Sequence, residues 1–148
     1  GLYQPVDKKT KNKLTDFILS PSEKSFYSHN KNLFFINSQH EKDLALLQAA
    51  LKITFAGTGL GEFKHYDFIP CHELALSVHI NKKQFQLVDV DKQTALQILK
   101  GQTQFNFSCN DGYVLASYQN IPFAFLKKIK SRFNNLYPKG WYIRMSID

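Results

Sequence analysis

The chain has 148 residues, 43% of them hydrophobic and 21% charged, which is typical of a globular protein with one core and excludes two large domains. Its formal charge of +7 and its pI near 9.4 favour a polyanionic partner. No apolar run approaches the roughly 20 residues of a membrane-spanning helix, and Cys71 and Cys109 alone provide neither a disulfide framework nor a four-ligand zinc site. We therefore expect a cytoplasmic protein with no membrane partner.

The first 38 residues predict a helical segment that acts as a linker or docking surface. Asp7 is positioned to cap a helix through Leu19, with lysines on its outer face. Ser20-Pro21-Ser22-Glu23 has the pattern of a capping box and predicts a second short helix toward Tyr27. The apolar run over residues 33–36 predicts a buried strand.

Short helices and strands are predicted for the middle of the chain. We expect a helix over residues 41–48 and a strand over 50–56. The glycine cluster at 57–61 lacks the Gly-Lys-Ser/Thr ending of a phosphate loop, so it predicts a tight turn rather than nucleotide binding. We next expect a strand over 61–64, an extended connection over 67–70 and an amphipathic helix over 71–78. The helix is expected to bury Leu74, Ala75 and Val78.

The helix with the clearest signals at both ends is predicted in the second half of the chain. Asp91 is a suitable N-cap for a helix over residues 92–100, and Gly101 is a suitable left-handed C-terminal cap. The helix is expected to bury Ala95, Leu96 and Leu99. Strands are predicted over residues 85–88, 105–107, 113–118 and 122–128. The elements together predict an α+β protein built around a small, mostly antiparallel barrel or sheet with a few short helices.

The C-terminal third is basic and aromatic. Between Gly112 and Ile147 there is no acidic residue, and cations alternate with aromatic residues. Positive charge beside flat aromatic surface is typical of a nucleic-acid-binding face. Nearly all the cations of the chain are lysines, which favours contact with phosphates over the reading of bases. A strand-rich core edge with a solvated basic rim is the alternative interpretation, since aromatic residues also favour strands and cores.

Catalytic patterns are weak. His72 and Glu73 are adjacent on a predicted helix and therefore face apart, so they do not form a dyad. Cys71 follows a proline, as the nucleophile of cytosine methyltransferases does, but this chain has no room for the cofactor-binding fold of such an enzyme. A small buried residue at a helix start is the preferred role for Cys71. We predict no catalytic residue and no metal site in this chain.

Five motifs occur in an order that is familiar from a known family. They are Gly59-Leu60-Gly61-Glu62-Phe63-Lys64, Phe68-Ile69-Pro70-Cys71-His72-Glu73-Leu74-Ala75-Leu76, Asp111-Gly112-Tyr113-Val114-Leu115, Ala124-Phe125-Leu126-Lys127 and Asn135-Leu136-Tyr137-Pro138-Lys139-Gly140-Trp141. From about residue 44 to 144 the chain resembles the C-terminal PUA-like domain of the bacterial rRNA small-subunit methyltransferase F family. These are Nol/Nop/Sun-type RNA cytosine-5 methyltransferases.

The resemblance implies a PUA-like pseudobarrel over residues 39–148 that holds structured ribosomal RNA and is itself noncatalytic. It also implies an upstream methyltransferase domain that uses S-adenosylmethionine, and no cofactor in the present chain. Residues 1–38 then join the two domains, and the start at Gly1 without methionine is expected of a piece of a longer protein. We expect a monomer that functions in rRNA processing and methylation.

The family motifs imply the RNA-facing residues Gly61, Lys64, Lys127, Asn135, Tyr137, Pro138, Lys139 and Gly140. The basic and aromatic pattern adds Lys128, Lys130, Arg132, Trp141 and Arg144. The chain departs from the family where Gly-Trp-Gly-Lys is replaced by Ala124-Phe125-Leu126-Lys127, and where a common arginine is replaced by Tyr142. In the Tyr-Pro-Lys-Gly turn, proline fixes one backbone angle and Gly140 is expected to allow an unusual one.

Two other functions remain open from the sequence. The first is a protein-interaction module that docks on a methyltransferase domain through residues 1–38 and positions it. The second is a small-ligand or nucleoside enzyme on a similar barrel, which would need a convergent acid and base that the sequence does not supply.

Overall fold

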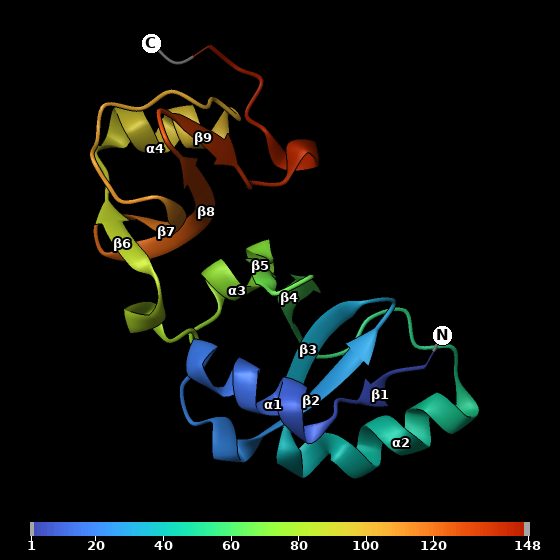
Figure 1. Cartoon of the computed structure of the whole chain (residues 1–148). Helices are drawn as coiled ribbons and strands as arrows, with labels where there is room; N and C mark the ends of the chain where they lie inside the picture. The colour runs from blue at the N-terminus through green and yellow to red at the C-terminus, as the bar shows by residue number, and fades with distance from the viewer. Residues whose placement is uncertain (1, 147–148) are drawn as a thin grey trace. The chain divides into compact units, whose positions relative to one another are not determined.

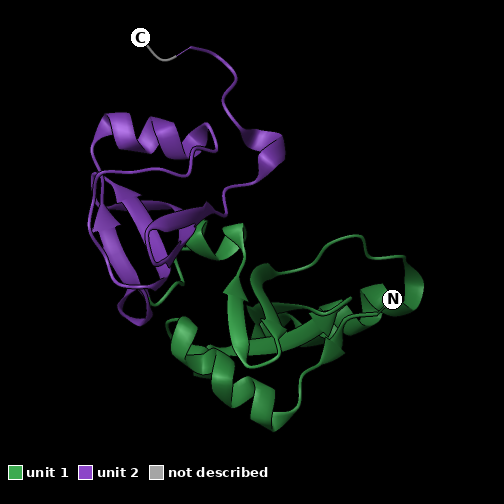
Figure 2. Ribbon diagram, turned by 45° about the horizontal axis from the view of Figure 1, so that its top comes forward, with its two compact units in different colours: residues 1–81 green, residues 82–148 purple. Residues whose placement is uncertain are grey.

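Residues 2–146 are described by the computed structural model, and the chain divides into two compact units, unit 1 (residues 1–81) and unit 2 (residues 82–148) (Figure 2). Gly1, where the sequence suggested a cut chain, lies outside the described residues. Both units combine one sheet with a few short helices, so the predicted α+β class with mostly antiparallel strands is confirmed (Figure 1). The predicted boundary after residue 38 falls inside unit 1, and the roles assigned to the two predicted regions stay predictions.

Unit 1 is built on a five-stranded antiparallel sheet in which the strands follow chain order. Its strands are β1 (Gln4–Pro5), β2 (Lys24–His29), β3 (Asn32–Asn37), β4 (Thr58–Lys64) and β5 (Asp67–Pro70). Its helices are α1 (Lys8–Leu14), η1 (Thr15–Phe17), η2 (Pro21–Glu23), η3 (Ser38–His40), α2 (Glu41–Ala50) and α3 (His72–Leu76). The Asp7 carboxylate accepts a hydrogen bond from the Thr10 amide at 2.6 Å, which confirms the predicted cap.

Three expectations for unit 1 are wrong. The second helix is only the single turn η2, because Lys24–His29 pairs with β3 through a hairpin whose turn residues, Asn30 and Lys31, have positive φ. The expected strand over 50–56 does not form, since α2 continues to Ala50 and an irregular segment follows. Val78 lies beyond the end of α3 and is 86% exposed, whereas the other two predicted apolar residues of that helix are buried.

Unit 2 is built on a four-stranded sheet of order β6-β7-β8-β9. Its elements are η4 (Lys82–Gln84), β6 (Gln86–Asp89), α4 (Lys92–Leu99), β7 (Gly112–Tyr118), β8 (Ile121–Ile129), β9 (Arg132–Asn135) and η5 (Lys139–Trp141). The first strand pair is parallel, and parallel neighbours need a crossover, which α4 supplies. Ala95 and Ile98 of α4 pack with Val114, Leu126 and Phe133 of the sheet, so one face of the sheet is covered by the helix (Figure 1).

The signals at the ends of α4 are confirmed. Asp91 accepts a hydrogen bond from the Thr94 amide at 2.7 Å, and Gly101 has a φ of +79°. The buried apolar residue in the last turn is Ile98, while the predicted Leu96 and Leu99 are half-buried. The expected strand over 105–107 is wrong, because this segment is an irregular loop held by ring contacts to Phe133. Strand β9 was not expected.

Candidate nucleic-acid interface

Strand β8 presents its two adjacent lysines to opposite faces of the sheet. The Lys127 ammonium lies 4.7 Å from the centre of the Tyr113 ring and donates a hydrogen bond to the Tyr113 hydroxyl at 3.2 Å. The Lys128 ammonium lies 4.7 Å from the centre of the Phe133 ring, which belongs to the core on the α4 side. Both lysines are half-buried and both make cation–π contacts. A single flat RNA surface therefore cannot contact both ammonium groups in the same way.

The turn between β8 and β9 carries two more of the predicted cations. Lys130 has a φ of +54°, and its amide donates a hydrogen bond to the Asp111 carboxylate at 2.9 Å. That bond fixes the turn against the start of β7. The side chains of Lys130 and Arg132 are both exposed at this end of the strand pair. The hairpin thus directs two cations to solvent from a turn with a defined backbone.

Asn135, at the end of β9, is a clamp within unit 2. Its side-chain amide donates to the Ile98 carbonyl at 2.8 Å and to the Gln102 carbonyl at 2.9 Å. Its side-chain oxygen accepts from the Tyr137 amide at 2.9 Å. The Ile98 carbonyl, near the end of α4, also accepts from the Gly101 amide, so Asn135 gives it a second donor. The predicted RNA-facing role of Asn135 remains untested, but both amide hydrogens are already used inside the fold.

An aromatic cluster follows β9, formed by Tyr137, Trp141 and Tyr142. The rings of Tyr137 and Tyr142 are parallel within 12° at 6.3 Å, and Trp141 meets Tyr137 edge-to-face at 6.4 Å. Tyr137 is half-buried against the core, whereas Trp141 is 59% exposed. Of the three rings, Trp141 therefore has the largest exposed fraction from which to stack on a base.

The turn Pro138-Lys139-Gly140 presents a charge beside this cluster. The Trp141 amide donates to the Pro138 carbonyl at 2.9 Å, which closes the single turn η5. Lys139 and Gly140 are exposed, and a Cβ on Gly140 would meet no atom within 4 Å. The expectation of an unusual backbone angle at Gly140 is wrong, since its φ is not in the left-handed region. Gly140 instead leaves the surface open.

Among residues 2–146, the side chains of the exposed cations in the hairpin and after β9 form no ion pair, although the Asp111 carboxylate binds the backbone of Lys130. These cations are Lys130, Arg132, Lys139 and Arg144. Arg132 is the first of the four residues of β9, and Lys139 follows it by seven positions along the chain. We call these exposed cations together with Trp141 the basic strip.

Gly61 and Lys64, the two other implied RNA contacts, belong to unit 1. Gly61 has a φ of +142°, and a Cβ there would lie 2.0 Å from the Ile69 carbonyl oxygen, so glycine is needed for the pairing of β4 with β5. Lys64 is exposed at the end of β4. Gly61 thus has a structural reason to be glycine, while its predicted contact with RNA stays a prediction.

Cys71 is the residue whose position after a proline resembles that of a catalytic nucleophile. Burial, together with a hydrogen bond to Glu73, raises the pKa of Cys71 to about 12, so its thiol is not an activated nucleophile. In the part of the chain that the structure describes, no group of three or more His, Cys, Asp and Glu side chains could hold a metal ion. No helix of the described residues is long and apolar enough to cross a membrane.

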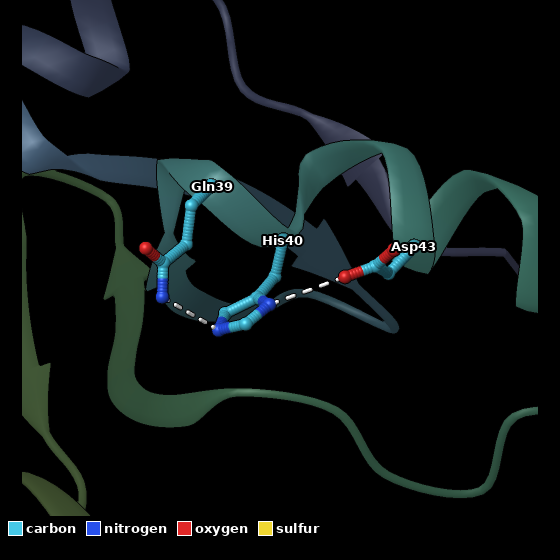
Figure 3. A network of polar contacts seen from close by, with 3 residues as sticks. All are labelled: Gln39, His40 and Asp43. Carbon is cyan, nitrogen blue, oxygen red and sulfur yellow. Dashed lines mark hydrogen bonds and ion pairs between the residues drawn. The ribbon is translucent and has the colours of Figure 1, made fainter.

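A polar network of Gln39, His40 and Asp43 stands out at the start of α2 (Figure 3). The His40 ring lies 3.2 Å from the Asp43 carboxylate and 3.1 Å from the Gln39 amide. His40 and Asp43 are both more than half exposed, so the dielectric is high and the pair is weak. The contacts connect η3 to the first turn of α2, which gives them a local structural role.

Comparison with known families finds a match within unit 2. Residues 85–143 match the family model described as the methyltransferase RsmF PUA domain. The match begins directly after η4, one residue before β6, and ends one residue after Tyr142 of the aromatic cluster, so it includes most of the basic strip. No curated protein matches the chain.

Proposed function

Residues 85–143 form a PUA-like domain of the RsmF methyltransferase type, and on this premise we propose that the chain is a noncatalytic RNA-binding module. Its ligand is structured ribosomal RNA, held while a methyltransferase domain of the same protein modifies a cytosine at carbon 5. S-adenosylmethionine would be bound by that domain and not by this chain. We assign the module to the cytoplasm, as a monomer.

The observation that carries this proposal is the basic strip. Its cations are exposed, their side chains form no ion pair among residues 2–146, and Lys139 is two residues before the exposed indole ring of Trp141. A phosphate backbone binds such a surface through charge, and an unstacked base can lie on the ring. Lys127 is half-buried on Tyr113, so its contribution is expected to be smaller than that of the exposed cations.

Filter binding of a structured rRNA fragment to the full chain tests the proposal. Lys130→Ala and Lys139→Ala are each expected to weaken binding. Lys92→Ala, which removes an exposed lysine from the first turn of α4, is the matched control and should leave the affinity nearly unchanged. Equal losses from all three variants would mean that only net charge matters and would contradict a defined face.

A protein-docking role is the second candidate. It is favoured by three exposed leucines, Leu46 and Leu47 in the second half of α2 and Leu51 directly after it, which provide apolar surface on unit 1. The chain would then bind the methyltransferase domain and position it. The chain should then bind a separately produced methyltransferase domain, and Leu46→Glu should abolish that binding. This result, together with no binding of RNA, would favour the docking role over the first.

A further inference from the structure

Unit 1 contains a small pocket, which is separate from the basic strip of unit 2. It has a volume of about 180 Å³, and its lining includes Asn32, Phe34, Phe55, Gly59, Cys71 and Glu73. An apolar cavity of about 150 Å³ holds one benzene ring. The pocket is therefore of a size for one planar ring system rather than for a large ligand.

Glycine at position 59 keeps the pocket open. A Cβ on Gly59 would lie 3.0 Å from the Cys71 sulfur and 3.4 Å from a carboxylate oxygen of Glu73. Any larger side chain would fill the space between β4 and the start of α3. The φ of Gly59 is not in the left-handed region, so the reason for glycine here is space and not backbone angle.

Two aromatic rings form one wall. Phe34 and Phe55 meet edge-to-face, with centroids 5.9 Å apart and planes at 82°. Phe34 is buried in the sheet, whereas Phe55 is 58% exposed on the irregular segment before β4. An exposed aromatic face beside a ring-sized pocket is a stacking surface for an unpaired base.

The polar groups of the pocket favour a ligand that donates hydrogen bonds. Glu73 is exposed, and its carboxylate oxygens are hydrogen-bond acceptors. The Cys71 thiol, with its pKa raised to about 12 by burial and by Glu73, stays protonated and brings no second negative charge. Guanine presents two adjacent donors, the ring N1–H and the amino group, to such a carboxylate. Uracil presents a single N–H between two carbonyl oxygens, and adenine and cytosine each place a ring acceptor beside their amino group.

We propose that this pocket binds one unpaired guanine of the RNA, stacked on Phe55 and hydrogen-bonded through its Watson–Crick edge to Glu73. The inference rests on the proposed RNA-binding function and adds a base-specific subsite to the phosphate contacts of the basic strip. Sequence-specific recognition of RNA uses unpaired bases in this way.

Affinities of the full chain for pentanucleotides of uridine with one altered central base test the subsite. Central guanine is expected to bind at least about fivefold more tightly than uracil, and inosine, which lacks the amino group, should fall between them. Glu73→Gln should abolish the preference, while Glu62→Gln, the matched loss of a carboxylate on β4, should retain it. Phe55→Ala should weaken the guanine complex about fivefold or more, and Phe55→Tyr should not.

Photocrosslinking on the unaltered protein provides a second measurement. A pentanucleotide with central 6-thioguanosine is expected to crosslink to the Phe55 segment or to Cys71. Equal affinity for guanine and uracil, or crosslinks confined to residues 127–141, would overturn the subsite while leaving RNA binding by unit 2 intact. Absence of any binding to a structured rRNA fragment would instead overturn the proposed function as well.

Discussion

Gly101 lies directly against the ring of Tyr142: a Cβ on Gly101 would be 2.2 Å from the Tyr142 Cε2 atom. The contact joins the end of α4 to the segment after η5, and the hydrogen bond from the Ile143 amide to the Leu99 carbonyl, 2.9 Å long, reinforces it. Glycine is thus required twice at this position, by its φ of +79° and by the ring. The position of the aromatic cluster depends on this contact.

Gly101→Ala is expected to destabilise unit 2 by about 2 to 4 kcal/mol, from the left-handed backbone and from overpacking against Tyr142. Urea denaturation followed by the fluorescence of Trp141, the single tryptophan, measures it. The double variant with Tyr142→Ala should lose less stability than the sum of the two single variants. Strict additivity would show that the two residues do not interact.

Asn135→Ala is expected to cost about 2 to 3 kcal/mol, because it removes three hydrogen bonds and leaves two carbonyls of the α4 region without that partner. Asn134→Ala changes the exposed neighbouring residue and should stay within about 0.5 kcal/mol of the unaltered chain. The same denaturation curves give both values. Equal stability of the two variants would show that the hydrogen bonds of Asn135 do not stabilise unit 2.

Gly140→Ala separates binding from folding. The added methyl group meets no atom within 4 Å, so the free energy of unfolding should change by less than about 0.5 kcal/mol. If RNA approaches the turn closely, the affinity for a structured rRNA fragment should fall severalfold. Unchanged affinity in this folded variant would place the RNA away from Gly140.

Asp89→Asn tests a link between β6 and the turn that joins β7 to β8. Two hydrogen bonds to the Asp89 carboxylate hold its pKa below the ordinary value. The larger effect comes from the Ser117 hydroxyl at 2.7 Å, and the smaller from the Asn120 amide at 2.8 Å. A carboxyl whose pKa is lowered by folding stabilises the protein above its unfolded pKa of about 3.9, and this contribution is lost as the pH falls through the folded pKa. The variant should therefore lose stability less steeply than the unaltered chain below about pH 4. Parallel acid denaturation profiles would contradict this.

The parts of the fold set by local signals were predictable. Helix α4 has a cap at Asp91 and a glycine at position 101, and both signals act within a few residues. The capping-box pattern before β2 predicted a helix that does not form, because the pairing of β2 with β3 overrides the local preference. Strand β9 is short and polar and exists through its pairing with β8, so no local pattern marked it.

The sequence indicated which residues to consider for RNA binding, which stays a prediction, but it did not indicate the contacts that these residues make within the fold. The motif that begins at Asn135 was identified, but its contacts to Ile98 and Gln102 join residues more than thirty positions apart. The aromatic partners of Lys127 and Lys128 come from neighbouring strands, Tyr113 on β7 and Phe133 on β9. Such pairs follow from strand register, which a single sequence does not specify.

The most direct test of RNA binding by the basic strip is the salt dependence of the affinity of the full chain for a structured rRNA fragment. The logarithm of the association constant should fall linearly with the logarithm of the salt concentration, by about 0.7 to 0.9 per phosphate contacted. The slope for the double variant Lys130→Ala/Lys139→Ala should be shallower by the amount expected for the loss of about two phosphate contacts. Lys92→Ala should keep the slope of the unaltered chain. An affinity independent of salt, or the same slope in all three proteins, would contradict the account.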